Sequence, residues 1–210
     1  MFQSPIYWLV LFASAGIFWV LPRTVRFGFL GLVSFGYFYW LDVHRIEADS
    51  ALAYLRINPP VVLLIWSIVF FSLAPRVAQK GRAGKAILAA LILGIIAYLA
   101  YFKYIPKLAA EMFGADSFMT HIALPLGISY FTFKLIHYAA EVAKGTITDR
   151  SFGQFFCYIF LFPIFTAGPI ARFDHFLAGQ SRGLRVSDLV LGLTRIHSGL
   201  LKQFVIAALL

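Results

Sequence analysis

The sequence predicts an all-α integral membrane protein, a polytopic helical bundle with five or six spans. Apolar residues make up 61% of the 210 residues and charged residues only 13%, and the charged ones cluster between apolar runs. A soluble domain is about a quarter charged and spreads its charges over its surface. Clustering between apolar runs is instead typical of a chain whose runs lie in hydrocarbon. We expect a multi-pass protein of the cytoplasmic (inner) membrane.

The charge and cysteine content exclude several other classes. Lys and Arg produce a net charge of +9, but they flank apolar runs and form no basic face of the kind that binds nucleic acid. Membrane lipids are the better partner, because anionic headgroups attract such flanking charge. The single cysteine, Cys157, excludes an internal disulfide framework and a cysteine-based metal site. The first apolar run lacks a basic leader and a cleavage site, so we interpret it as a span.

Six apolar segments are the candidate spans: 6–21, 27–41, 61–74, 86–102, 122–140 and 155–171. Several are shorter than the roughly 20 residues that cross a hydrocarbon core of about 30 Å. Tilt, flanking residues or partial insertion must complete those crossings.

The basic residues indicate an orientation. Alternate connections hold eight of them (Arg23, Arg26, Arg76, Lys80, Arg82, Lys85, Lys144, Arg150), against four in the others (Arg45, Arg56, Lys103, Lys107). Basic loops stay preferentially in the cytoplasm. We therefore expect the N-terminus on the extracytoplasmic side.

The sixth segment, 155–171, contains Pro163, Gly168 and Pro169. A proline inside a helix removes a hydrogen bond and clashes with the preceding turn, which predicts a broken or re-entrant helix. Backbone freed at membrane depth is tolerated where protein or a water-filled cavity surrounds it, so the break favours a polar pathway. An ordinary kinked span is the alternative.

The C-terminal part is predicted to hold a soluble-looking stretch over 172–187 and a last helix over 189–210. Ser187 and Asp188 are expected to cap that helix. We expect it to lie at the membrane interface or against the bundle. The sequence stops inside an apolar run without a C-cap, so we expect a truncated domain.

Polar groups also occur inside the fifth segment. Lys134, His137, Tyr138 and Glu141 follow one another at helical spacing and share one face. Ionisable groups in a span turn toward a bundle interior or a cavity, because lipid exposure costs several kcal/mol. The alternative is structural: Lys134 and Glu141 pair across a turn or snorkel, and His137 is a satisfied core histidine.

Three runs carry a family resemblance. The run 125–145 begins Pro-Leu-Gly-Ile-Ser-Tyr-Phe-Thr-Phe-Lys, the run 161–173 contains Ala-Gly-Pro-Ile-Ala-Arg-Phe, and the run 199–207 begins Gly-Leu-Leu-Lys-Gln. Together they resemble, in order, the motifs of the membrane-bound O-acyltransferase family, in its bacterial branch of alginate O-acetylation and teichoic acid D-alanylation. The resemblance covers the entire chain but only about the N-terminal half of a typical member. Residues 1–210 would thus be the N-terminal part of one such domain.

Two departures from the family pattern limit what carries over. The usual glutamine is Lys134 here, and His137 replaces a small polar residue. The family's catalytic histidine lies in a later segment, expected beyond Leu210, and no histidine of this chain (His44, His121, His137, His175, His197) occupies its motif. We therefore assign no catalytic residue and no metal ligand, and expect the chain alone to be inactive.

The resemblance implies acyl transfer through a tunnel. A cytoplasmic thioester, acyl-CoA or an acyl carrier protein, would supply the acyl group, and no bound cofactor is expected. Hydroxyls of an extracytoplasmic polysaccharide would accept it, together with an extracytoplasmic acetylation partner protein. The tunnel-lining candidates are Pro125, Gly127, Ser129, Lys134, His137, Glu141, Gly168, Pro169 and Arg172.

Each of these candidates also has a structural interpretation. Gly127 can allow close helix packing, Ser129 can bond the carbonyl one turn back, and Arg172 can anchor at headgroups. Two other functions also stay open: a transporter or channel half that assembles with a second copy, and an inactive truncated remnant.

Overall fold

The structure, a computed structural model, describes residues 4–47, 59–79, 81–113, 125–148, 151–165, 172–178, 185–202 and 205. All regular secondary structure in these ranges is helical, as the sequence predicts. The chain divides into two compact units, Met1–Phe176 and Leu177–Leu210.

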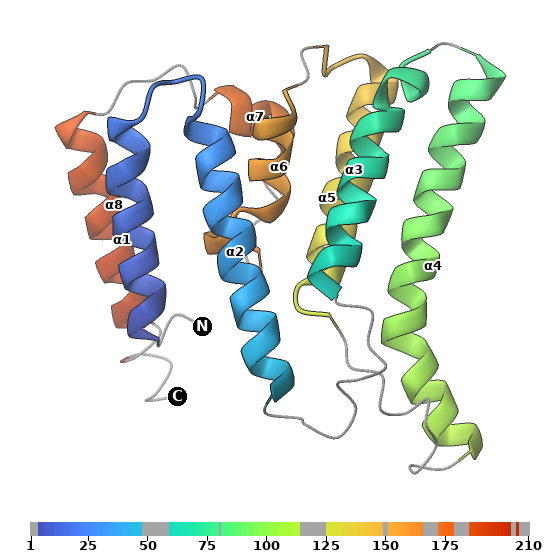
Figure 1. The fold of residues 1–210 in the computed structure, drawn as a ribbon, viewed down its shortest axis with the longest axis horizontal. Helices are drawn as coiled ribbons and strands as arrows, with labels where there is room; N and C mark the ends of the chain where they lie inside the picture. Colours follow the sequence, from blue (N-terminus) through green and yellow to red (C-terminus); the bar gives the residue numbers. More distant parts are fainter. Residues whose placement is uncertain are drawn as a thin grey trace. The chain divides into compact units, whose positions relative to one another are not determined.

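The apolar runs of the sequence become helices with somewhat different ends (Figure 1). The first unit contains α1 (Pro5–Val20), α2 (Arg26–Glu47), α3 (Pro59–Val77), α4 (Arg82–Phe113), α5 (Ile128–Lys144), α6 (Phe152–Phe160) and the 3-10 helix η3 (Phe162–Ile164). The short α7 (Phe173–Ala178) crosses the boundary between the units, and α8 (Val186–Leu201) lies in the second.

Within the first unit, α3, α4 and α5 pack against one another, and α2 packs along α6 (Figure 1). Helix α1 packs on α2. The ends where α1 leads into α2, α3 into α4, and α5 into α6 lie at the same end of this unit in Figure 1. These are the connections whose basic residues are predicted to share one side of the membrane.

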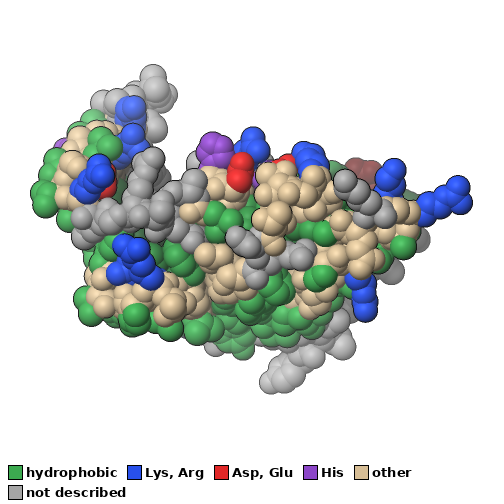
Figure 2. All heavy atoms as spheres, turned by 90° about the horizontal axis from the view of Figure 1, so that it is seen from above, with side chains coloured by type: hydrophobic (Ala, Val, Ile, Leu, Met, Phe, Trp, Pro, Cys, Tyr) green, Lys and Arg blue, Asp and Glu red, His purple; other side chains and the backbone are tan. Residues whose placement is uncertain are grey.

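Among the residues that the structure describes, two helices are long and apolar enough to cross a membrane: α3, and α4 over Arg82–Leu108. Two shorter apolar helical stretches, Pro5–Val20 and Phe152–Ile164, accompany them. Large apolar side chains such as Leu9, Leu32 and Leu93 are about two-thirds exposed, a degree of exposure that suits a lipid environment better than water. Figure 2, which looks onto the end of the first unit where Arg82 begins α4, shows basic side chains set among apolar ones.

Helix α6 is the centre of the first unit. Its residues from Phe155 to Phe160 are all buried, so it is a helix that is apolar around its whole circumference. Gly31 of α2 permits the close approach: a Cβ there would lie 2.6 Å from Phe156 Cδ1 and 3.1 Å from Cys157 N. Phe35 of α2 also contacts the Phe160 ring, at 5.1 Å between centroids.

The predicted cap of the last helix is wrong. Helix α8 begins at Val186, with Arg185 as the capping residue and no side-chain cap hydrogen bond. Ser187 and Asp188 therefore lie inside the first turn, where the Asp188 carboxylate still favours the positive end of the helix dipole. The predicted extension of this helix to residue 210 lies outside the described residues, except for residues 202 and 205.

Candidate functional site

The site begins at the turn that leads into α5. Pro125 is buried, its carbonyl accepts a hydrogen bond from the Ile128 N–H at 3.3 Å, and Gly127 has a left-handed φ of +69°. A Cβ at Gly127 would lie 2.7 Å from Phe165 Cε1 and 2.8 Å from the Phe165 carbonyl oxygen. This position needs glycine both for its backbone conformation and for its space. The turn thus places the start of run 125–145 directly against run 161–173.

The predicted interruption of the sixth segment is confirmed, and it begins at Leu161. Helix α6 has 9 residues and ends at Phe160, and a 3-10 turn follows over Phe162–Ile164. At 1.5 Å per residue α6 is about 14 Å long, roughly half a hydrocarbon core. Gly168 and Pro169, the other predicted breakers and tunnel candidates, lie outside the described residues.

Lys134 of α5 reaches this break. Its side chain is fully buried, and its ammonium donates hydrogen bonds to the carbonyl oxygens of Tyr158 at 2.8 Å and Ile159 at 3.2 Å. The ammonium nitrogen also lies 4.7 Å from the centroid of the Tyr130 ring, close enough for a cation–π interaction. The cation therefore sits at the C-terminal end of α6, the negative end of that helix dipole.

The predicted polar face of α5 does point into the protein. Lys134, Tyr138 and Glu141 are all buried, while His137 is partly exposed. The Tyr138 ring packs on the Phe155 ring at 4.4 Å between centroids. The sequence signal for this face was the helical spacing, and it is confirmed as an inward-facing stripe.

The charged groups on this face have different partners, so Lys134 and Glu141 do not pair with each other, as the structural alternative allowed. Glu141 accepts a hydrogen bond from the Lys144 ammonium at 2.7 Å, at the end of α5 beyond the predicted span. That hydrogen bond lowers the pKa of the Glu141 carboxyl against the opposing effect of its burial. His137 Nε2 is buried and has no hydrogen-bond partner among the residues the structure describes.

Ser129 and Arg172 are the two remaining tunnel candidates that the structure describes. Ser129, in the first turn of α5, is half-buried. Arg172 precedes α7 and is exposed, and its guanidinium lies 3.1 Å from a carboxylate oxygen of Asp174. An exposed pair of this kind contributes little to stability.

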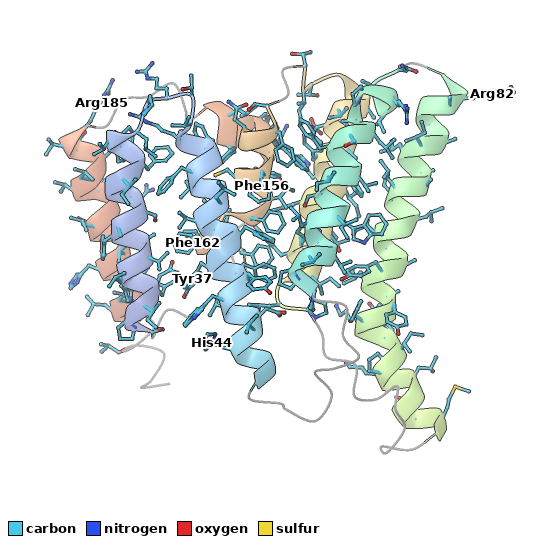
Figure 3. All side chains as sticks on the ribbon, viewed as in Figure 1. Tyr37, His44, Arg82, Phe156, Phe162 and Arg185 are labelled. Carbon is cyan, nitrogen blue, oxygen red and sulfur yellow. The ribbon has the colours of Figure 1, made fainter. Side chains whose placement is uncertain are left out.

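Sequence reasoning missed the residues on the other side of these contacts. Gly127 packs against Phe165, and Lys134 donates to the carbonyls of Tyr158 and Ile159. The Phe162 ring packs on Tyr37 of α2 at 5.3 Å between ring centroids (Figure 3). Pro163 was the available signal, because a proline leaves a carbonyl without its helical donor. The described residues hold no cluster of His, Cys, Asp and Glu that could bind a metal ion.

Comparisons with known proteins find similar sequences. A "probable alginate O-acetylase AlgI" of Pseudomonas putida is 36% identical over 132 residues, which is 56% of this chain and 27% of the relative. The protein of the same name from Azotobacter vinelandii is 27% identical over 219 residues, covering 98% of this chain and 41% of the relative. A teichoic acid D-alanyltransferase of Lacticaseibacillus rhamnosus is 28% identical over 139 residues, 56% of this chain and 34% of the relative.

The chain thus spans less than half the length of these curated relatives. No protein-family model and no solved structure matches it. Both kinds of relative are named for acyl transfer, and both belong to the branches that the three motifs indicate. The resemblance of this chain to the membrane-bound O-acyltransferases, in their alginate O-acetylase and teichoic acid D-alanyltransferase branches, is confirmed.

Proposed function

We propose that residues 1–210 form the N-terminal part of a membrane O-acyltransferase that moves an acyl group, acetyl by preference, to hydroxyls of an extracytoplasmic polysaccharide. A cytoplasmic acyl-CoA or acyl carrier protein supplies the group, and an extracytoplasmic partner protein assists at the acceptor. The names of the relatives support acyl transfer to a cell-envelope polymer. The protein spans the inner membrane five or six times, with the basic helix ends in the cytoplasm.

The observation that carries the proposal is the contact between the two motif runs at a broken helix. Gly127 meets Phe165, and Lys134 holds the carbonyl end of α6. An enclosed half-helix ending at membrane depth is the kind of element that borders substrate passages, because it ends the helix without exposing its backbone to lipid.

The chemistry is an ester exchange. The oxygen of an acceptor hydroxyl bonds to the acyl carbonyl carbon, the carbon–sulfur bond of the thioester breaks, and the departing thiolate takes a proton. A general base removes the hydroxyl proton, and by resemblance this base is a histidine outside residues 1–210. The present residues contribute by holding donor and acceptor in line, which supplies a large share of the rate.

Within this scheme, Pro125, Gly127, Ser129, His137, Gly168, Pro169 and Arg172 line or shape the passage. Lys134 and Glu141, both buried and both engaged with other residues, support its wall from within. His137 Nε2 and Thr132 Oγ1 are buried polar atoms of α5 without a hydrogen-bond partner among the described residues, and we propose that His137 faces the passage.

The test is a gene disruption in the native host, with ester analysis of its surface polysaccharides. Loss of base-released acetate, restored by the complete gene, is the expected result. Loss of base-released alanine with acetate unchanged would reassign the acyl group. Unchanged ester content in the disrupted strain, with the protein shown to be expressed in the parent, would contradict the proposal and favour the transporter or the inactive remnant.

A further inference from the structure

The backbone carbonyls at the C-terminal end of α6 lose their helical hydrogen-bond donors, because the helix ends at Phe160. The last four carbonyls of any α-helix lack donors from within the helix. If α6 continued, the Phe162 N–H would serve the Tyr158 carbonyl and the residue 163 N–H would serve the Ile159 carbonyl. Residue 163 is a proline, which has no N–H. The chain has also turned into η3 at this point.

Lys134 serves the same two carbonyls. Its ammonium carries three donors, and two of them go to the Tyr158 and Ile159 oxygens at 2.8 Å and 3.2 Å. The nitrogen also lies 5.2 Å from the Tyr158 ring centroid and 4.7 Å from that of Tyr130. A side chain 24 and 25 positions earlier in the chain thus supplies what the break removes.

We propose that Lys134 and Pro163 are a matched pair: Pro163 ends α6, and Lys134 is the positioning residue that caps it and locks the break in place. This inference goes beyond acyl transfer and does not depend on it. Lys134 touches no reacting atom in the scheme above, and its role is to fix the direction in which the chain leaves α6.

A buried cation suits this place for an electrostatic reason. Removing a charge from water is costly unless the site replaces the lost hydration. Two carbonyls at the negative end of a helix dipole and two aromatic faces offset part of that cost. A neutral amide at the same position could donate to the carbonyls but would gain less from the dipole.

The break matters because of what it positions. Directly after it, Phe165 packs on Gly127 and on the Phe38 ring, at 4.3 Å between centroids. Phe162 packs on Tyr7 and Tyr37 at 5.7 Å and 5.3 Å. If α6 ran on as a straight helix, these rings would leave their partners on α1, α2 and the α5 turn.

Cys157, the only cysteine of the chain, is a native reporter of this lock. It is fully buried on α6, immediately before the first carbonyl that Lys134 binds, so a small thiol reagent should modify it slowly in the purified protein. Lys134→Met keeps a similar volume but removes the donors that Lys134 provides to the Tyr158 and Ile159 carbonyls. The break should then open more often and the modification rate should rise about tenfold or more.

Lys134→Gln is the matched control. It also lacks the cation, so any effect of that charge on the thiol is the same in both variants, but its amide can still donate to a carbonyl. We expect its rate to stay within about threefold of the parent rate. Cys157→Ser sets the background. Equal rates for Lys134→Met and Lys134→Gln, or no change in either, would overturn the assignment.

A second variant tests the pairing itself. Pro163→Ala restores an N–H at residue 163, which can serve the Ile159 carbonyl. In that background, Lys134→Met should raise the Cys157 rate by only about threefold. Strictly additive effects would overturn the pairing. If Lys134→Met does not accumulate at all, recovery of folded protein by adding Pro163→Ala supports the pair, and no recovery refutes it.

The Cys157 modification rates do not involve acyl transfer. A result that overturns the capping role of Lys134 can therefore be distinguished from a result that overturns the proposed function. Ester content in the complemented host is measured in parallel. If Lys134→Met raises the Cys157 modification rate but leaves the ester content unchanged, the break is not needed for acyl transfer. The capping role of Lys134 would still stand.

Discussion

The Gly127 turn offers the sharpest test of how the two motif runs meet. Gly127→Ala asks the backbone to keep φ at +69° with a side chain present, and it places a methyl group 2.7 Å from Phe165 Cε1 and 2.8 Å from the Phe165 carbonyl oxygen. The ring could rotate away. The carbonyl oxygen could not, because it belongs to the backbone that follows η3. The variant must therefore displace one run from the other.

The cost has two parts. An L-residue held in the left-handed region loses about 1–2 kcal/mol, and forcing a methyl into a packed site costs about 1–3 kcal/mol more. The sum is about 2–5 kcal/mol. In a protein of this size each kcal/mol shifts the thermal midpoint by roughly 2–4 °C, so a fall of about 4–20 °C is expected.

The assay is thermal unfolding of the purified chain in detergent, with Gly36→Ala as the matched control. Gly36 lies in α2, has no positive φ, and a Cβ there would meet nothing within 4 Å. Alanine at that position should leave the midpoint unchanged or raise it slightly, because glycine is the poorer helix former. A Gly127→Ala midpoint no lower than that of the Gly36→Ala control would refute the contact between the two runs.

Three further predictions concern the packing and the membrane placement. Gly31→Ala should lower the thermal midpoint, because its methyl would meet Phe156 Cδ1 at 2.6 Å and separate α2 from α6; an unchanged midpoint would argue against that close approach. The basic 76–85 connection should be cytoplasmic, and its labelling by an impermeant reagent in intact cells would contradict the topology. A polar reagent should modify His137→Cys but not Ile136→Cys, and equal modification of the two would exclude a cavity beside this face.

The six apolar segments correspond in order to α1 to α6, but the ends of these helices were not predictable, and α7 (Phe173–Ala178) lies in the stretch 172–187 that was not predicted to be helical. The predicted 86–102 segment became α4, which runs from Arg82 to Phe113. Hydropathy detects the part of a helix that suits hydrocarbon, whereas the helix itself continues through Lys103 and Lys107, where charged side chains are compatible with helix. At α5 the difference is reversed, because the Gly127 turn starts the helix at Ile128, inside the predicted 122–140 segment.

The inward face of α5 was predictable because helical spacing alone puts Lys134 and Glu141 on one stripe. Their partners were not. Lys134 binds backbone carbonyls, and a carbonyl has no residue type by which a sequence could reveal it. Glu141 pairs with the exposed Lys144 at i+3 rather than with another buried residue of the stripe, and local geometry at the end of the helix decides between such neighbours.

The same break explains why both runs carry unusual residues. A helix that stops inside the protein needs a donor for its open carbonyls and a clear path for the chain that follows. Lys134 supplies the donor, and Gly127 leaves space for the chain at Phe165. Gly127 immediately precedes α5, and Lys134 lies in α5 seven positions later, about two helical turns away. Runs 125–145 and 161–173 are therefore one structural unit in two pieces. Replacing the first run by an ordinary apolar helix would remove the Lys134 donors from the Tyr158 and Ile159 carbonyls and would crowd the turn against Phe165, however well the new helix crossed the bilayer.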